Sequence, residues 1–324
     1  MIVPSVTSAL VVPLATGMSL SCVFSFLRSK RPNAKYVIWP RIDQKSSFKA
    51  IYFSGLIPIV IENKLCGDVV CTDMEAILKS MDSYQDEILC VLSTTSCFAP
   101  RIPDKIDEIA MACAAKDIPH VINNAYGLQS TKISRAIERS IVKGRVDAIV
   151  QSSDKNFLVP VGGAIICSPC ESNVKEIAQM YPGRASVSPL LDLMISLLSM
   201  GSQKYKQLVE ERESNFHYMR SQLEEIPNVK VLDTPENDIS IAINLNCIAT
   251  SDVKEIGSML FSRFVSGARV VPRNAIKMVN GITFHGFGSH INEYPHQYIT
   301  FAASLGQTKE EIDLAISRMR SILY

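Results

Sequence analysis

The sequence predicts an α/β protein with a mostly parallel sheet covered by helices on both faces, followed by a smaller α+β domain at the carboxyl end. Three observations predict this class. Apolar runs of strand length alternate with amphipathic stretches, the alternation stops near Ser188, and a different order of strands and helices follows Pro227. The 324 residues are enough for two domains. We place a large domain at residues 1–195, connecting helices at 196–225 and a small domain at 226–324.

The large domain begins with a predicted strand near residues 10–14, a turn at 15–17 and a helix over about 18–28. A second helical pattern runs from Asp73 to Met81, and a third covers residues 103–115 with Pro103 in its first turn. The other predicted strands are apolar runs at residues 36–39, 58–61, 88–92, 120–122, 146–150 and 163–167.

Beyond Ser188, apolar residues recur at three- and four-residue steps with a break near Gly201, which predicts two consecutive helices. The small domain is then expected to contain a helix near 252–264, with Asp252 near its start, and a final helix at 309–323. Its predicted strands lie at residues 240–245, 270–271, 281–284 and 298–303.

The composition excludes several classes of protein. With 47% hydrophobic and 20% charged residues, the chain is neither disordered nor collagen-like. The net charge of +1 gives no global reason for a polyanionic partner, so any nucleic-acid contact must be local. Nine scattered cysteines fit a reducing compartment, with the cytoplasm as the default. The single CxxC at residues 167–170 and the histidines at 285, 290 and 296 lack metal-site spacing, so we predict no metal.

The apolar segment from Ile2 to Leu27 could be taken for a signal or membrane anchor. No positive charge precedes it, Pro13 and Gly17 interrupt it, and hydroxyl side chains lie at its centre. A buried strand, a glycine-containing turn and a helix explain these interruptions. We therefore predict no membrane contact for this segment.

Polar residues follow several predicted strands, where the carboxyl ends of a parallel sheet gather a ligand. Thr16 and the helix start behind it could bind a phosphate. Lys155 lies in a short polar turn, and an isolated lysine there is usually a solvated surface residue. Ser152 and Asn123 change this interpretation, because they could contact the phosphate and ring of a ligand with which Lys155 forms a Schiff base. This chain order is typical of pyridoxal-phosphate enzymes of the aspartate-aminotransferase type, fold type I.

Longer runs of sequence resemble one family of such enzymes. From about Val11 to the C-terminus, the chain closely resembles O-phosphoseryl-tRNA(Sec) selenium transferase, the eukaryotic and archaeal selenocysteine synthase. The resemblance rests on these motifs: Val12-Pro-Leu-Ala-Thr-Gly-Met-Ser19, Ile38-Trp-Pro-Arg-Ile-Asp-Gln-Lys-Ser46, Ser93-Thr-Thr-Ser-Cys-Phe-Ala-Pro-Arg101, Asn123-Asn-Ala-Tyr-Gly127, Asp154-Lys-Asn-Phe157 with Val159-Pro-Val-Gly-Gly163, Met180-Tyr-Pro-Gly-Arg-Ala185 and Val265-Ser-Gly-Ala-Arg-Val-Val-Pro272.

The resemblance implies a role for each matching residue. Lys155 would carry the cofactor, pyridoxal 5'-phosphate, and act in catalysis. Arg184 would bind the phosphate of the substrate, and Arg269 would recognise the unpaired end of the tRNA acceptor arm. The other residues expected at the cofactor are Ala15 and Thr16 in the phosphate cup, Gln44, Asn123 and Ala125 near the ring, and Ser152 at the phosphate.

The implied reaction converts O-phosphoseryl-tRNA(Sec) to selenocysteinyl-tRNA(Sec) with selenophosphate, in a cytoplasmic homotetramer. Lys155 would remove the α-proton, phosphate would leave from the β-carbon, and selenium would add in its place. Asn123 occupies the place where most relatives of the fold carry an aspartate. Its neutral amide would support a protonated ring nitrogen less strongly.

The sequence departs from the family at its start, because it begins at the strand that leads to the phosphate cup. The family's N-terminal segment helps to bind tRNA and to build the tetramer, so a product starting at Met1 is expected to retain cofactor weakly and bind tRNA poorly. Two alternatives stay open. A pyridoxal-phosphate lyase or sulfurtransferase for a small amino acid would not need Arg269, and an inactive truncated subunit or paralogue would show no cofactor signal.

Overall fold

The computed structural model describes residues 3–246 and 253–323, and the chain divides into two compact units. The large unit contains Met1–Glu62, Thr72–Ser96 and Pro103–Lys204. The small unit contains Asn63–Cys71, Cys97–Ile102 and Tyr205–Tyr324. Two short segments from the first third of the chain thus belong to the small unit, which no periodicity in the sequence indicates. The division into two units does not test the predicted domain limits 1–195, 196–225 and 226–324, which stay a prediction.

The large unit is built on a seven-stranded sheet in the order β1-β9-β8-β7-β6-β2-β3. Strands β8, β7, β6, β2 and β3 are parallel, whereas β9 is antiparallel to both of its neighbours, β8 and β1. The sheet is therefore mostly parallel, as predicted, and β1 runs in the same direction as β8. The strand bounds are Ser8–Val12 for β1, Tyr36–Pro40 for β2, Ile57–Ile61 for β3, Ile88–Thr94 for β6, His120–Asn123 for β7, Ala148–Ser152 for β8 and Ala164–Ser168 for β9.

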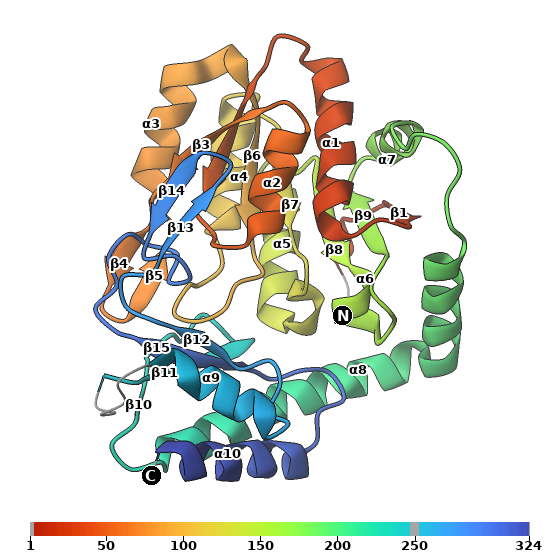
Figure 1. Cartoon of the computed structure of the whole chain (residues 1–324). Helices are drawn as coiled ribbons and strands as arrows, with labels where there is room; N and C mark the ends of the chain where they lie inside the picture. The colour runs from red at the N-terminus through yellow and green to blue at the C-terminus, as the bar shows by residue number, and fades with distance from the viewer. Residues whose placement is uncertain (1–2, 247–252, 324) are drawn as a thin grey trace. The chain divides into compact units, whose positions relative to one another are not determined.

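Helices of the large unit form two groups against this sheet (Figure 1). Helices α1, α2 and α7 lie on one face, where α1 buries Leu20, Val23 and Phe24. Helices α3, α4 and α5 cover the other face, where Ile77 and Ile109 pack against strand residues such as Val91. The bounds are Thr16–Lys30 for α1, Lys45–Phe53 for α2, Met74–Tyr84 for α3, Ile106–Ala115 for α4, Thr131–Lys143 for α5, Ser153–Phe157 for α6 and Glu171–Gln179 for α7.

The structure shows where the two helices that were predicted to begin near Asp73 and Pro103 start. Asp73 caps α3, since its carboxylate accepts a hydrogen bond of 3.1 Å from Ala76 N. Pro103 was expected in the first turn of the next helix, and that expectation is wrong: α4 begins at Ile106 with Lys105 as its N-cap. A buried hydrogen bond instead holds the preceding segment, because Thr94 N donates to Asp104 Oδ2 over 2.6 Å. Among residues 3–246 and 253–323, no helix is long and apolar enough to cross a membrane.

Helix α8 (Ser188–Glu224) begins in the large unit and continues into the small one. Gly201 interrupts it with φ 65° and ψ 176°, a conformation that favours glycine. The predicted break near Gly201 is therefore confirmed.

The small unit has a four-stranded antiparallel sheet in the order β10-β11-β15-β12. Its core joins this sheet to α8, α9 and α10 through apolar residues that include Leu223, Leu260 and Ile316. Asp252, expected near the start of α9, lies outside the described residues. The bounds are Lys64–Cys66 for β4, Val69–Cys71 for β5, Lys230–Val231 for β10, Ser240–Asn244 for β11, Val253–Ser262 for α9, Arg269–Val271 for β12, Ile276–Val279 for β13, Ile282–His285 for β14, Tyr298–Ala302 for β15 and Lys309–Leu323 for α10.

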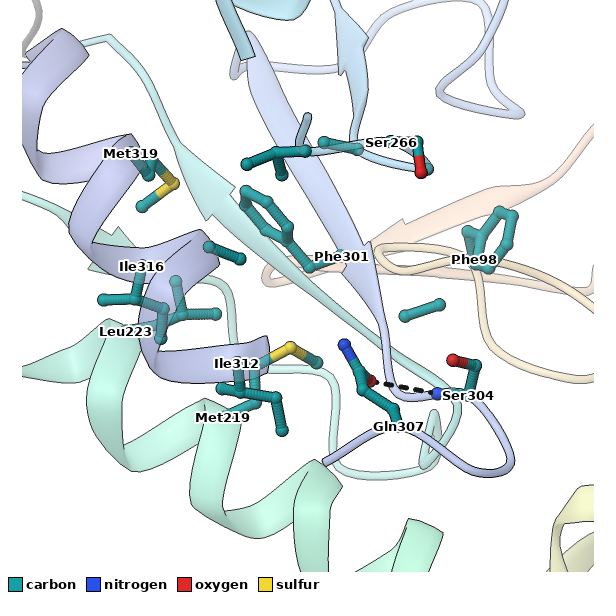
Figure 2. Close-up of a pocket in the computed structure, with 15 residues that line it drawn as sticks. Phe98, Met219, Leu223, Ser266, Phe301, Ser304, Gln307, Ile312, Ile316 and Met319 are labelled. Carbon is teal, nitrogen blue, oxygen red and sulfur yellow. Dashed lines mark hydrogen bonds between the residues drawn. The ribbon is translucent and has the colours of Figure 1, made fainter. Parts of the chain in front are cut away.

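A cavity of about 270 Å³ lies inside the small unit, between α8, α10 and the loop before β12 (Figure 2). Met219, Ile312 and Phe301 give it mostly apolar walls. Gln307 is a polar residue in its lining, and its amide oxygen accepts a hydrogen bond of 3.3 Å from Ser304 N.

Gly144 ends α5 where the backbone of α4 passes close by. A Cβ at this position would meet the carbonyl group of Ala110 and would lie 2.6 Å from Met111 N, which only a backbone shift could relieve. We expect Gly144→Ala to lower the free energy of unfolding by about 2 kcal/mol or more, measured by urea denaturation. Gly257→Ala is the control, because its Cβ would meet Val270 Cγ2 at 3.4 Å and alanine favours a helix such as α9. Equal losses for both variants would contradict the close approach of α4 and α5.

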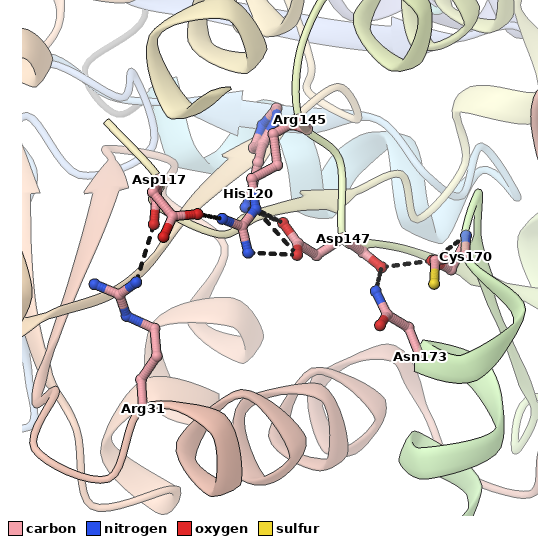
Figure 3. A network of polar contacts seen from close by, with 8 residues as sticks. Arg31, Asp117, His120, Arg145, Asp147, Cys170 and Asn173 are labelled. Carbon is pink, nitrogen blue, oxygen red and sulfur yellow. Dashed lines mark hydrogen bonds and ion pairs between the residues drawn. The ribbon is translucent and has the colours of Figure 1, made fainter. Parts of the chain in front are cut away.

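A polar network lies at the amino ends of β7 and β8, since His120 begins β7 and Asp147 directly precedes β8. Figure 3 shows its side chains. The Asp147 carboxylate accepts hydrogen bonds from His120 N at 2.8 Å and from Arg145 Nε at 2.9 Å. Arg145 also pairs with Asp117 at 2.5 Å, and Arg31 donates to the Asp117 carbonyl over 2.9 Å. The network ties the segments that lead into both strands to the end of α1.

His120 is fully buried in this network. Its Nδ1 lies 3.1 Å from Arg145 O and its Nε2 lies 2.7 Å from Ser93 Oγ, so a neutral ring donates to the carbonyl and accepts from the hydroxyl. Burial lowers the pKa of His120 from 6.5 to about 4.

This lowered pKa predicts acid sensitivity. Between pH 6.5 and about 4 the unfolded chain binds a proton at His120 that the folded chain does not, so stability falls as the pH drops through this window. We expect a slope of up to about 1.4 kcal/mol per pH unit from this group. His120→Gln keeps a donor and an acceptor but does not titrate, so its unfolding free energy should fall less steeply over the same window. Identical slopes would show that His120 does not cause the sensitivity.

Candidate active site

The residues of the large unit that were predicted to bind the cofactor lie at one edge of its sheet. Val12 at the end of β1 pairs with Ala164, and Ala164 pairs with Ser152 at the end of β8. Asn123 ends the neighbouring parallel strand β7. Because β1 and β8 run in the same direction, residues that follow β1, namely Ala15 and Thr16, come to the same edge. The structure thus brings together residues that are up to 140 positions apart in the chain.

Lys155 lies in the short helix α6, directly after β8. Its Nζ is 3.1 Å from Asp154 Oδ2 and donates to Ser152 Oγ over 3.3 Å. The Ser152 hydroxyl in turn donates to Asp154. The Lys155 side chain remains 46% exposed, so its amine is accessible to a ligand. Sequence reasoning assigned no role to Asp154, although it belongs to the quoted Asp-Lys-Asn-Phe motif.

The backbone around Lys155 is fixed by buried hydrogen bonds. Asn156 Nδ2 donates to Ala125 O at 2.9 Å and to Ser152 O at 2.7 Å, and Ser152 N donates to Ala125 O at 3.0 Å. Gln129 Nε2 donates to Lys155 O over 2.5 Å. Ala125 therefore contributes a carbonyl that connects the ends of β7 and β8.

Two buried oxygens at this edge have no hydrogen-bond partner within the described part of the chain: Thr16 Oγ1 and Asn123 Oδ1. Asn123 is only 2% exposed, and its backbone carbonyl accepts from Thr95 N at 3.1 Å. Leaving a buried polar atom unpaired costs about 1–3 kcal/mol. Such atoms at a sheet edge mark a place where a bound polar ligand supplies the missing partners.

Gln44 is half-buried at the N-cap of α2. Its Nε2 donates to Ser96 O at 3.1 Å and to the Tyr126 hydroxyl at 3.3 Å. Tyr126 N donates to Ser96 Oγ at 2.9 Å. Gln44 is therefore held beside the carboxyl ends of β6 and β7. Ser96 and Tyr126 belong to motifs quoted above, but no pattern in the sequence predicts that they hold Gln44 by hydrogen bonds.

The two arginines predicted to bind the substrate and the tRNA, Arg184 and Arg269, lie in other segments of the chain. Arg184 lies in an exposed segment between α7 and α8, after Gly183 with φ 97°, and its guanidinium makes no ion pair with any described residue. Arg269 begins β12 in the small unit, where its Nη2 lies 3.2 Å from the position that a Cβ of Gly288 would take. In residues 3–246 and 253–323, no cluster of three or more His, Cys, Asp or Glu side chains could hold a metal ion.

The sequence profile of O-phosphoseryl-tRNA(Sec) selenium transferase, SepSecS, matches residues 3–324. The chain belongs to this family. The SepSecS of Dictyostelium discoideum is 46% identical over 98% of this chain and 71% of its own length. The relative from Methanocaldococcus jannaschii is 37% identical over 98% of this chain and 70% of its own length.

Solved structures agree with this assignment. The crystal structure of an archaeal SepSecS is similar with a TM-score of 0.88 and 35% identity, over 97% of this chain and 70% of that one. Mouse CSAD, with a TM-score of 0.73 and 12% identity over 98% of this chain and 72% of that one, shares the fold. So does the structure of Oryza sativa TDC with PLP, with a TM-score of 0.72 and 13% identity over 98% and 69% of the two chains. The fold is therefore that of the fold type I pyridoxal-phosphate enzymes, as predicted.

Pyridoxal phosphate fits the sheet edge of this SepSecS family member. The unpartnered Thr16 hydroxyl and the first turn of α1 suit a phosphate, because both offer donors to an anion. The buried Asn123 amide suits a polar heterocycle, and the accessible Lys155 amine suits an aldehyde.

Proposed function

We propose that this chain converts O-phosphoseryl-tRNA(Sec) into selenocysteinyl-tRNA(Sec), with selenophosphate as the selenium donor and pyridoxal phosphate as the cofactor. The observation that carries the proposal is the combination of an accessible Lys155 with the unpaired oxygens of Thr16 and Asn123 at one sheet edge, in a member of the SepSecS family. The proposed setting is the cytoplasm.

Lys155 is the proposed catalytic residue. When bound, pyridoxal phosphate supplies the conjugated ring that takes up the electron pair of the α-carbon. Lys155 Nζ holds the cofactor and then takes the α-proton, so it must remain within reach of both. Asp154 and Ser152 contact Nζ at 3.1 and 3.3 Å and orient it for these tasks. Thr16 and Ser152 bind the cofactor phosphate, and Ala15, Gln44, Asn123 and Ala125 position the cofactor.

The arginines are proposed to bind the substrate. Arg184 is exposed and without an ion-pair partner among the described residues, so its planar fork is available to the phosphate of phosphoserine. Arg269 is proposed to contact the unpaired end of the tRNA acceptor arm. A local contact of this kind is consistent with the net charge of +1.

Self-association, proposed here as a homotetramer, is supported by an exposed apolar stripe on α8. Leu191, Met194, Ile195 and Leu198 recur at helical spacing and are 46%, 53%, 58% and 76% exposed. A stripe of this kind typically marks an interaction surface. We name these four residues the α8 stripe.

We expect the double substitution Ile195→Lys and Leu198→Lys to shift the protein to smaller assemblies in sedimentation velocity, because two charges would be buried in the contact. Circular dichroism should be unchanged, since both side chains are exposed in the single chain. Val142→Lys, at a 69% exposed position of α5, is the control and should leave the assembly intact. Equal assembly of all three proteins would exclude the α8 stripe as the contact.

The proposal is tested by absorbance titration with pyridoxal phosphate, followed by a gel shift with phosphoseryl-tRNA(Sec). Both signals are expected for the proposed enzyme when the cofactor and the tRNA are supplied at high concentration. Cofactor absorbance without a tRNA shift would favour a lyase or sulfurtransferase for a small amino acid. Absence of both signals would indicate a chain without catalytic activity of its own.

A further inference from the structure

The hairpin of β4 and β5 holds two cysteine thiols against each other in the small unit. The strands are antiparallel, with Leu65 opposite Val70 and Cys66 opposite Val69. Cys66 Sγ lies 3.7 Å from Cys71 Sγ. The Cys66 side chain is exposed, whereas Cys71 is half-buried. A soluble oxidant therefore reaches Cys66 more easily than Cys71.

The turn and the strand β5 of this hairpin are anchored to other segments of the small unit. Asp68, which lies between the two cysteines in the chain, forms an ion pair of 3.3 Å with Lys230. The Asp68 carbonyl accepts a hydrogen bond of 2.7 Å from the Tyr294 hydroxyl. Val70 N donates to Pro100 O at 3.0 Å, and Val70 O accepts from Ile102 N at 3.1 Å. These contacts hold β5, and the antiparallel pairing of β4 with β5 holds Cys66 close to Cys71. A bond between them needs the sulfurs to approach to about 2.05 Å.

We propose that Cys66 and Cys71 form a reversible disulfide and serve as a redox-sensitive site of this protein. The oxidant class is a small-molecule disulfide such as oxidised glutathione. The Cys66 thiolate attacks one sulfur of the oxidant, which forms a mixed disulfide and releases one thiolate. Cys71 then loses its proton to solvent and attacks the Cys66 sulfur, which releases the second thiolate. Two cysteine thiols are oxidised to one disulfide, and one disulfide is reduced to two thiols.

The proposed disulfide is a reversible switch and not a permanent crosslink, because the Cys66 side chain is exposed to solvent. An exposed disulfide is open to attack by cellular thiols, and the proposed cytoplasmic setting keeps such a pair reduced at rest. The buried cysteines Cys113 and Cys167 do not compete for the oxidant in this way. Burial raises the pKa of the Cys167 thiol to about 11 and also raises that of Cys113, so both stay protonated and shielded.

The test is peptide mass spectrometry on the whole chain. The protein is incubated with oxidised glutathione, alkylated and digested with trypsin, which cuts after Lys64 and Lys79 and so places Cys66 and Cys71 together in residues 65–79. We expect this peptide to lose two hydrogen atoms and to take up no alkylating reagent. Dithiothreitol should restore two alkylations. Two alkylated cysteines after oxidation, or two bound glutathiones, would overturn the proposal.

Two variants test the order of the steps. Cys71→Ser is expected to accumulate one glutathione on Cys66, because the resolving thiol is gone. Cys170→Ser removes another exposed cysteine and should leave the 65–79 disulfide unchanged. If Cys71→Ser takes up no glutathione while the unaltered chain still forms the disulfide, Cys66 is not the first site of attack and the proposed order is wrong. Hydrogen exchange should slow in the oxidised hairpin, and unchanged exchange would contradict a restraint on it.

Discussion

Replacing Lys155 with alanine is expected to lower the rate of selenocysteinyl-tRNA(Sec) formation by roughly 10³-fold or more. The substitution removes both the amine that holds the cofactor and the base that takes the α-proton, and a positioned base by itself contributes about 10²–10⁴-fold. The near-visible absorbance of lysine-bound pyridoxal phosphate should disappear as well. Single-turnover kinetics and absorbance spectra check the two effects on the same sample.

Stability separates this loss from misfolding. The Lys155 side chain is 46% exposed, and an ion pair of this kind contributes about 1 kcal/mol or less, so the urea midpoint should change little. Lys175→Ala is the matched control, because Lys175 is an exposed lysine paired with a neighbouring acid, Glu171. If Lys155→Ala kept the absorbance band, Lys155 would not be the residue that holds the cofactor.

Replacing Arg184 with alanine is expected to lower kcat/KM for the phosphoseryl substrate by roughly 10²–10³-fold. Two charge-assisted hydrogen bonds to a phosphate, at about 1.5–3 kcal/mol each, account for a loss of this size. Arg184→Lys should recover only part of it, since an ammonium group keeps the charge and loses the planar fork. Steady-state kinetics with varied phosphoseryl-tRNA(Sec) give the value.

The control for Arg184 is Arg135→Ala, which removes an exposed arginine from α5. Arg135→Ala should leave kcat/KM within about twofold, and the cofactor absorbance should be unchanged in every arginine variant. A similar loss in both alanine variants would indicate a general effect of positive charge on tRNA binding, and the specific role of Arg184 would then be wrong.

The sequence predicted the elements that a simple periodicity marks. β6 begins with the uninterrupted apolar run Ile88–Leu92 and is buried along its whole length, so the sequence predicts its position directly. The break at Gly201 was visible because glycine interrupts a long helical pattern. Helix α5 was missed, although Ile133 and Ile137 lie one turn apart on its buried side. Pro103 was placed inside α4 because a proline suits the first turn, whereas the helix begins three residues later.

The arrangement of the site could be predicted only in part. Asn123 and Ser152 end two strands that are consecutive in the chain and pair in parallel, and Lys155 follows the second of them, so their proximity follows from parallel pairing. Thr16 reaches them only because β9 lies antiparallel between β1 and β8, and no pattern in the sequence indicates that insertion. The contact of Gln44 with Tyr126 depends on side-chain geometry between distant segments, which periodicity does not contain.

The most direct test of the proposed function is product formation by the purified 324-residue chain. The protein is supplied with saturating pyridoxal phosphate, selenophosphate and phosphoseryl-tRNA(Sec) labelled in the amino acid, and the released amino acids are separated by chromatography. The structure and the family assignment lead us to expect selenocysteine from the unaltered chain and only phosphoserine from Lys155→Ala. Absence of selenocysteine, while the Dictyostelium discoideum relative produces it in the same assay, would contradict the proposed function.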